Sequence, residues 1–253
     1  MTLPKIMVAP NGAFKRKSDH PAVPETVSEL IETAVSCANA GADGIHAHVR
    51  DEGGQHVLDA GLYREFLTEL EAVLPGFYAQ ITTEAIGRFT PDEQRHVVRQ
   101  VQPKAVSVAL REMMSGDKAA ARDFYHGSVE AGIEVQHILY DAKEVDWLAD
   151  LIEDGTIPDR PLSLLHVLGR YRPGHETVPS DLSAPLVRQM VRDLKPDWAV
   201  CAFGAAETDC LKHAVRSGGK VRVGFENNLL NSDGRVAKDN AERVNRLRLA
   251  LES

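Results

Sequence analysis

Short apolar runs rich in β-forming residues alternate with longer segments of helical periodicity along the whole chain. Glycine, proline or polar residues bound each run, as is usual for strands of a buried parallel sheet. The pattern predicts eight strands, at residues 6–10, 44–49, 78–83, 105–110, 134–139, 162–168, 198–203 and 220–225.

The segments between these runs carry recognisable helix signals. In residues 26–40 the apolar positions share one helical face, and Gly41 follows as a stop. Thr90 and Pro91 supply an N-cap and a proline at the first helical position. The same pattern recurs in residues 180–194 and 240–251.

The strand–helix repeat decides the predicted fold class. Eight βα units within 253 residues match the usual size of a (β/α)₈ TIM barrel, and no residues remain for a second domain. We therefore predict an α/β fold made of a single barrel domain over residues 1–253, with a doubly wound open sheet as the alternative. Barrel enzymes keep their chemistry at the carboxyl ends of the strands, so residues there are the site candidates.

Two histidines stand at the carboxyl end of the second predicted strand. His46 and His48 are two positions apart, so both imidazoles lie on one face of the strand. In the eighth strand the same alternation puts Arg222, Gly224 and Glu226 on one face. Only the first strand separates these two strands around a barrel. Two imidazoles and one carboxylate with an open position are typical of catalytic zinc, so we predict one Zn²⁺ per chain on His46, His48 and Glu226.

Other polar residues on the strands leave alternatives open. Thr82 and Ser107, on the third and fourth strands, offer hydroxyls that can hold a carboxylate or carbonyl oxygen. His137 and His166, on the fifth and sixth, would complete a binuclear site like that of the zinc amidohydrolases. That family, however, has its histidine pair on the first strand and an aspartate on the eighth, so a mononuclear site is favoured.

The loop over residues 169–179 is long and polar and can form a lid. Its Arg170 and Arg172 are candidates to meet an anionic cofactor, but a solvated loop is favoured. The sequence has no GxGxxG or GxxxxGK[ST] loop, so a nucleotide would have to bind without one.

Charge and composition exclude several kinds of partner. The chain has 29 basic and 37 acidic residues, a net charge of −8 without a basic block, which argues against nucleic acid and anionic membranes. We find no signal-peptide pattern and no apolar stretch near the ~20 residues of a membrane-spanning helix. Three cysteines without CxxC spacing are expected to be reduced. These features predict a soluble cytoplasmic protein.

Taken together, the motifs resemble those of the β-keto acid cleavage enzymes. HAHVR at residues 46–50, the threonine pair after the third strand and GGKVRVGFENN at residues 218–228 are similar to that family's signatures. The segment NGAFKRKSDHPAVPETVSEL at residues 11–30 resembles its opening segment, so the resemblance covers the whole chain. It implies a zinc-dependent homotetramer that uses acetyl-CoA as co-substrate, converting a β-keto acid to acetoacetyl-CoA and a new acyl-CoA.

The resemblance also implies roles for individual residues. It assigns the metal to His46, His48 and Glu226, the substrate to Thr82, Ser107, Asn11 and Phe14, and catalysis to Arg222, Thr82, Glu84 and Asn227.

Several positions depart from the family pattern, and the arginine expected after the seventh strand is missing, since Ala205 and Ala206 stand there. Asn227 replaces an aspartate of the best-known member, and Glu84 stands where glycine is usual. Phe14 replaces a glutamate that recognises a substrate amino group. The departures predict a neutral or apolar β-keto acid, with Glu84, water or the substrate itself supplying the base.

Two other functions remain open from the sequence. A hydrolase or lyase on the same barrel would use metal-bound water and no CoA. A non-catalytic relative would keep the metal and lose the base. Dependence on acetyl-CoA would distinguish a β-keto acid cleavage enzyme from the hydrolase or lyase.

Overall fold

A closed barrel of eight parallel strands forms the centre of the computed structural model, which describes residues 2–170 and 176–252. The strands follow one another around the barrel in chain order, and the last pairs with the first. They are β1 (Ile6–Val8), β2 (Gly44–Ala47), β3 (Tyr78–Thr82), β4 (Ala105–Ala109), β5 (Glu134–Leu139), β6 (Ser163–Leu168), β7 (Asp197–Ala202) and β8 (Lys220–Val223). The predicted TIM barrel is confirmed, because the strands form a closed parallel barrel and every predicted run overlaps one of them.

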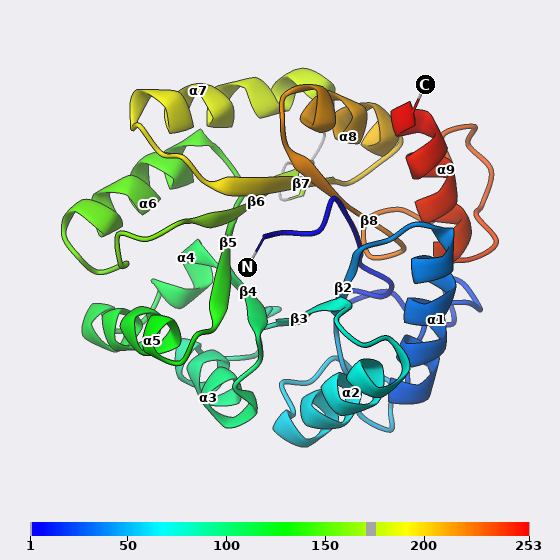
Figure 1. Cartoon of the computed structure of the whole chain (residues 1–253), viewed down its shortest axis with the longest axis horizontal. Helices are drawn as coiled ribbons and strands as arrows, with labels where there is room; N and C mark the ends of the chain where they lie inside the picture. Colours follow the sequence, from blue (N-terminus) through cyan, green and yellow to red (C-terminus); the bar gives the residue numbers. More distant parts are fainter. Residues whose placement is uncertain (1, 171–175, 253) are drawn as a thin grey trace.

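Helices form a ring around the barrel (Figure 1). Thr26 and Thr90 cap α1 and α3, each through a capping box with the glutamate three residues later. The helices are α1 (Val27–Ala40), α2 (Ala60–Val73), α3 (Pro91–Val101), α4 (Leu110–Met113), α5 (Lys118–Glu130), α6 (Ala142–Glu153), α7 (Ser183–Val191), α8 (Glu207–Arg216) and α9 (Asn240–Glu252), with a 3₁₀ turn η1 (Pro179–Leu182) before α7. None of these helices is long and apolar enough to cross a bilayer, within the residues described.

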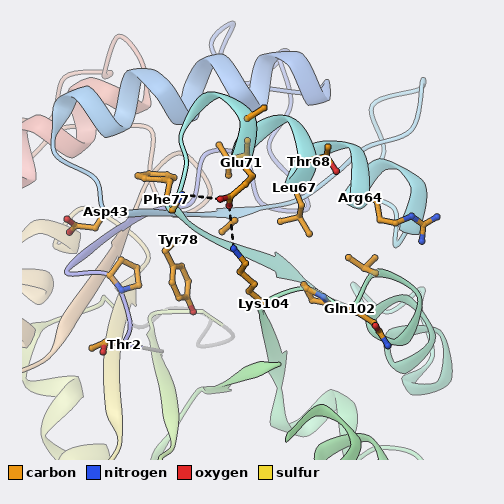
Figure 2. Close-up of a pocket in the computed structure, with 17 residues that line it drawn as sticks. Thr2, Asp43, Arg64, Leu67, Thr68, Glu71, Phe77, Tyr78, Gln102 and Lys104 are labelled. Carbon is orange, nitrogen blue, oxygen red and sulfur yellow. Dashed lines mark hydrogen bonds and ion pairs between the residues drawn. The ribbon is translucent and has the colours of Figure 1, made fainter. Parts of the chain in front are cut away.

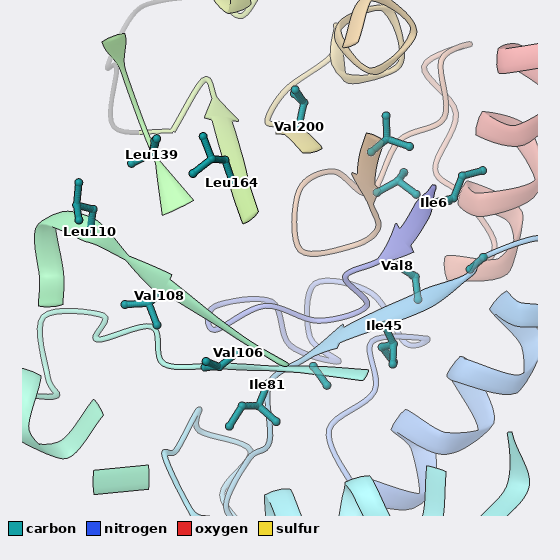
Figure 3. Close-up of a cluster of buried hydrophobic side chains, with 14 of the residues drawn as sticks. Ile6, Val8, Ile45, Ile81, Val106, Val108, Leu110, Leu139, Leu164 and Val200 are labelled. Carbon is teal, nitrogen blue, oxygen red and sulfur yellow. The ribbon is translucent and has the colours of Figure 1, made fainter. Parts of the chain in front are cut away.

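Strand side chains divide into two clusters, because alternate residues face the helices and the barrel interior. Ile45, Ile81 and Val106 belong to the outward cluster that packs under the helices (Figure 3). Ile138 and Leu165 belong to the inward cluster that fills the barrel. Burying a side chain of this size contributes about 1.5–3 kcal/mol. The interior is therefore a packed core rather than a channel.

The amino-terminal end of the barrel is sealed by the start of the chain. Leu3 is buried with the inward cluster, and its N–H donates to the Asp197 carboxylate at 2.8 Å. A groove of about 1050 Å³ also lies at this end, between α2 and the loop before β4, where exposed Lys104 pairs with Glu71 at 3.5 Å (Figure 2). Since barrels keep their chemistry at the opposite end, this groove is separate from the candidate site.

The end of β8 depends on a close backbone approach. Gly224 has a φ of +149°, and a Cβ there would collide with the carbonyl oxygen of Ala9. That same oxygen accepts the N–H of Glu226 at 3.1 Å. A side chain at position 224 would therefore push apart the backbone that carries Glu226.

We predict that Gly224→Ala destabilises the protein by about 1–3 kcal/mol, from backbone strain and displacement of Ala9. Thermal unfolding measures the change. Gly218→Ala is the matched control, because Gly218 also has positive φ, +87°, but a Cβ there meets nothing within 4 Å. Equal losses from both variants would contradict the role given to the close approach.

Candidate metal centre and active site

His46, His48 and Glu226 come together at the carboxyl end of the barrel. The histidine Nε2 atoms lie 3.1 Å apart, and each is 3.8 Å from Oε2 of Glu226. Two ligand atoms about 2.1 Å from one tetrahedral ion lie about 3.4 Å apart, so the spacing fits a shared metal. Within residues 2–170 and 176–252 this is the one such cluster of potential ligands.

A chain of side-chain amides orients His46. Its Nδ1 donates to Oε1 of Gln80 at 2.9 Å, Gln80 donates to Gln136 at 3.1 Å, and Gln136 donates to the Leu164 carbonyl at 3.3 Å. The proton is therefore on Nδ1, which leaves the Nε2 lone pair facing the metal position. Sequence reasoning missed this chain, although an inward-facing glutamine beside a histidine pair was the available signal.

Burial and neighbouring charges set the ionisation of the ligands. Burial lowers the pKa of His46 to about 3 and the pKa of His48 well below its ordinary value, so both imidazoles are neutral at pH 7. Burial alone would raise the pKa of Glu226, but neighbouring positive charge, chiefly that of Arg222, outweighs it and holds this pKa below its usual range. Neutral imidazoles and an ionised carboxylate are the forms that bind metal.

Arg222 and Glu226 form a buried ion pair beside the cluster. Nη2 of Arg222 donates to Oε1 of Glu226 at 3.0 Å, and both side chains are at most 5% exposed. Nε and Nη1 of Arg222 and Oε2 of Glu226 are buried without a protein hydrogen-bond partner. A buried polar group left unpaired costs about 1–3 kcal/mol, so these atoms are positioned for a ligand.

Glu226 reaches the site from a turn rather than from the strand. β8 ends at Val223, and the N–H of Asn227 donates back to the Gly224 carbonyl at 3.0 Å. The expected strand alternation through Glu226 is wrong, because the side-chain parity of a strand does not continue through a turn. Gly12 in the facing loop makes room, since a Cβ there would approach Cγ of Glu226 to 2.5 Å.

A small inner pocket lies beside the ligands. Its polar lining includes Thr82, Glu84, Arg170 and Arg222, and Ile138 is among its apolar residues. The Thr82 hydroxyl accepts the N–H of Glu84 at 3.0 Å, which leaves its own proton available to donate.

Ser107 lies next to Thr82 across the sheet. The two residues pair in the register of β3 and β4, and the buried Ser107 hydroxyl has no protein partner. Adjacent hydroxyls at this end of the barrel can bind the two oxygens of a carboxylate.

An ion pair crosses the mouth of the barrel from β6 to β3. Nη2 of Arg170 lies 2.6 Å from Oε1 of Glu84, and the side chains are 15% and 12% exposed. The solvated loop favoured for Arg170 is therefore wrong, because a buried carboxylate holds its guanidinium. Arg172 and the middle of the expected lid lie outside the described residues.

Glu84 faces the metal position with its other oxygen. Oε2 lies 3.9 Å from Nε2 of His48. Burial raises the pKa of Glu84 to about 7, although Arg170 acts in the opposite direction. The second carboxylate of the site thus lies within reach of a ligand on the metal.

The loop after β1 forms one wall of the opening. The buried Asn11 amide donates to the His48 carbonyl at 2.8 Å, so it fixes the end of β2, while Phe14 is 62% exposed. Arg50, which sequence reasoning missed, donates to the Gly12 carbonyl at 2.6 Å and holds this loop against the barrel. The contacts of Asn11 indicate a positioning role.

His137 and His166 point away from the barrel interior. The His137 ring lies 5.3 Å from Tyr125 of α5, and Nε2 of His166 bonds with Gln189 of α7. The binuclear alternative is therefore wrong, because both rings pack against the helices.

Comparison with known proteins decides the family. The sequence profile of the beta-keto acid cleavage enzymes matches residues 5–253. The chain belongs to the β-keto acid cleavage enzyme family. This confirms the sequence resemblance and the predicted enzyme class.

Relatives of this β-keto acid cleavage enzyme span the whole chain. The 3-keto-5-aminohexanoate cleavage enzyme of Fusobacterium nucleatum is 28% identical over 250 residues, which cover 95% of this chain and 89% of the relative. The 3-oxoadipate:acetyl-CoA acetyltransferase of Cupriavidus necator is 25% identical over 262 residues, covering 100% and 90%. Among solved structures, the binary complex of ObcA with oxaloacetate matches with a TM-score of 0.70 at 15% identity, over 92% of this chain and 64% of the ObcA chain. That likeness supports the barrel fold.

We predict that His46→Ala and Glu226→Ala each abolish metal retention by this β-keto acid cleavage enzyme, since each removes one of three ligands. Elemental mass spectrometry after metal loading and desalting would give about one ion per chain in the parent and close to none in the variants. His137→Ala, which alters a histidine facing the helices, is expected to keep the metal. Full occupancy in either ligand variant would show the assignment to be wrong.

Proposed function

We propose that the protein is a zinc-dependent acyltransferase that cleaves a β-keto acid with acetyl-CoA as co-substrate. The observation that carries the proposal is the ligand set of His46, His48 and Glu226 beside a pocket with unpaired polar atoms. Two neutral imidazoles and a carboxylate suit Zn²⁺ and leave a coordination position for substrate. When bound, zinc would polarise the keto oxygen and stabilise negative charge that develops on it.

Residues opposite the ligands suit the carboxylate of the keto acid. Thr82 and Ser107 are partners in the register of β3 and β4, and the proton of Thr82 is available because its oxygen already accepts the Glu84 N–H. Nε and Nη1 of Arg222 face the same interior without a protein partner. We assign the carboxylate to the two hydroxyls and the developing charge on the substrate to Arg222, since a guanidinium in a buried site stabilises such charge strongly.

Glu84 is our candidate for the base. The carboxamide of Asn227 accepts no proton at neutral pH, and Glu226 is committed to the metal and to Arg222. Glu84 lines the inner pocket, and its Oε2 lies 3.9 Å from His48, near the position a ligand on the metal would occupy. It would take a proton from the carbon between the keto group and the carboxylate.

The number of CoA groups in the reaction changes the products that the sequence resemblance implied. The carbanion adds to the thioester carbonyl of acetyl-CoA and expels the CoA thiolate. The thiolate then adds to the keto carbon, the bond between the keto carbon and its neighbour breaks, and Glu84 returns the proton. Acetoacetyl-CoA together with a second acyl-CoA would need two CoA groups, whereas one acetyl-CoA supplies one. We therefore propose acetoacetate and one acyl-CoA as the products.

Isotope labelling tests the reaction. Zinc-loaded protein with acetyl-labelled acetyl-CoA and a panel of β-keto acids is expected to give labelled acetoacetate and an unlabelled acyl-CoA, whose mass identifies the substrate. Mass spectrometry follows both products. Consumption of a keto acid without acetyl-CoA would favour the hydrolase or lyase alternative instead.

We predict that Glu84→Gln lowers kcat by about 10²–10⁴-fold while zinc is retained, because the amide cannot take the proton. Product formation under saturating substrates measures kcat, and elemental analysis measures zinc. Glu134→Gln, in a half-buried glutamate at the start of β5, is the matched control and should leave kcat unchanged. Unchanged kcat in Glu84→Gln would exclude Glu84 as the base.

We also propose a cytoplasmic homotetramer. Cys37, Cys201 and Cys210 are buried and form no disulfide, which suits a reducing compartment. Val187 and Met190 on α7 are 50% and 71% exposed, and exposed apolar side chains on neighbouring turns favour contact with another subunit. Light scattering in solution gives the molar mass that checks the assembly.

A further inference from the structure

An outer pocket of about 360 Å³ adjoins the inner pocket on the side away from β3 and β4. Phe14, Phe203, Arg170 and Asn227 line it, together with Glu226. Arg170, Phe203 and Glu226 also line the inner pocket, so the two are neighbours across these side chains.

The proposed reaction directs one part of the substrate to this outer pocket. With its carboxylate on Thr82 and Ser107 and its keto oxygen at the metal ligands, the keto acid extends from β3 and β4 toward β2 and β8. Its substituent, the group on the far side of the keto carbon, then continues toward the loops after β1, β7 and β8. Phe14, Phe203 and Asn227 lie in these loops.

The charged groups of the outer pocket are already paired. Arg170 is held by Glu84 at 2.6 Å, with its guanidinium 5.5 Å and 5.0 Å from the rings of Phe14 and Phe203. Glu226 is paired with Arg222 at 3.0 Å. A charged substituent would lose its hydration here without gaining a counter-charge, which is costly.

Lys15 is the remaining ionisable residue that lines the outer pocket. Its side chain is half-exposed, so its ammonium stays hydrated. An ion pair with an exposed lysine contributes little, about 0–1 kcal/mol, and is a weak means of selecting a substrate.

Asn227 supplies a neutral hydrogen-bonding group that the fold itself does not use. Its side chain is only 6% exposed, and both Oδ1 and Nδ2 are buried without a protein partner. Its backbone N–H is used by the turn, through Gly224. Since a buried amide without partners is costly, the carboxamide is positioned for a group on a ligand.

We propose that the outer pocket selects β-keto acids whose substituent is uncharged and carries a carbonyl or hydroxyl oxygen, which the Asn227 carboxamide binds between Phe14 and Phe203. The inference rests on the proposed function, because the reaction fixes the direction of the substituent. It gives Asn227, to which the resemblance assigns a catalytic role, a part in substrate selection beside Phe14.

A matched series of keto acids tests this selection. Four acids of equal chain length, whose substituents end in a carbonyl or hydroxyl, a methyl, a carboxylate or an ammonium, are compared by kcat/KM at saturating acetyl-CoA. We expect the oxygen-bearing neutral acid to exceed the methyl acid at least tenfold, and the charged acids to fall further. A charged acid as the best substrate would overturn the proposal.

Substitutions at Asn227 show whether its amide makes the choice. Asn227→Leu keeps the size and is expected to remove the tenfold preference for oxygen over methyl. Asn227→Asp is expected to improve the ammonium acid relative to the others. An equal loss for all four acids, or a rise in KM for acetyl-CoA alone, would assign the amide to acetyl-CoA or to the fold and overturn the proposal.

Phe14→Glu provides a second variant that does not disturb the core, since Phe14 is 62% exposed. It should raise kcat/KM for the ammonium acid relative to the others by up to about fivefold, because an ion pair with an exposed side chain contributes about 0–1 kcal/mol. Leu249→Glu, at a position on α9 that is 51% exposed, adds the same charge away from the site and should change no ratio. Unchanged ratios in Phe14→Glu would remove Phe14 from the subsite.

Binding separates failure of the selection from failure of the reaction. Calorimetry with zinc-loaded protein and each keto acid, without acetyl-CoA, measures the same order of preference when no turnover occurs. Tighter binding of the oxygen-bearing acid with no acyl-CoA formed would refute the proposed reaction and retain the selection. Acyl-CoA formed from all four acids at similar rates, with similar affinities, would support the proposed reaction and refute the selection.

Discussion

The buried ion pair between Arg222 and Glu226 is the interaction on which the candidate site depends. Burial alone would raise the pKa of Glu226, and a protonated carboxyl is a poor metal ligand. Arg222 keeps the carboxylate ionised, while its Nε and Nη1 atoms remain available inside the barrel. Such pairs are weak evidence for stability, because desolvation offsets much of their attraction. The pair of Arg222 and Glu226 is therefore explained by its effect on the ionisation of Glu226 rather than by a contribution to folding free energy.

The barrel separates stability from function along its axis. Its amino-terminal end is closed by Leu3 and the inward apolar cluster, whereas unpaired polar atoms of Ser107, Arg222 and Asn227 gather at the other end. Each unpaired atom lowers the stability of the protein without ligand, and the packed core outweighs that loss. A site that is incomplete without metal and substrate is what functional residues in a stable scaffold are expected to form.

Features set by local sequence were predictable, and those set by distant contacts were not. The positions of His46 and His48 follow from strand alternation, and the cap of α3 follows from Thr90 and its neighbours. The pairing of Arg170 with Glu84 joins residues 86 positions apart, and no periodicity reports it. Glu226 was assigned correctly to the cluster for an incorrect reason, because a turn replaces the expected strand.

The departures at positions 84 and 227 are reciprocal in charge. Relative to the best-known member, the chain loses a carboxylate where Asn227 stands and gains one at Glu84, so these two departures offset each other near the metal ligands, whereas the acid lost at Phe14 lies in the outer pocket. Two carboxylates, Glu84 and Glu226, face two guanidinium groups, Arg170 and Arg222, at 2.6 Å and 3.0 Å. A third carboxylate at position 227 would disturb this balance next to the metal ligand. We therefore infer that the proposed base and the proposed neutral subsite are one arrangement: an acid at Glu84 instead of position 227 leaves Asn227 free to recognise an uncharged substituent.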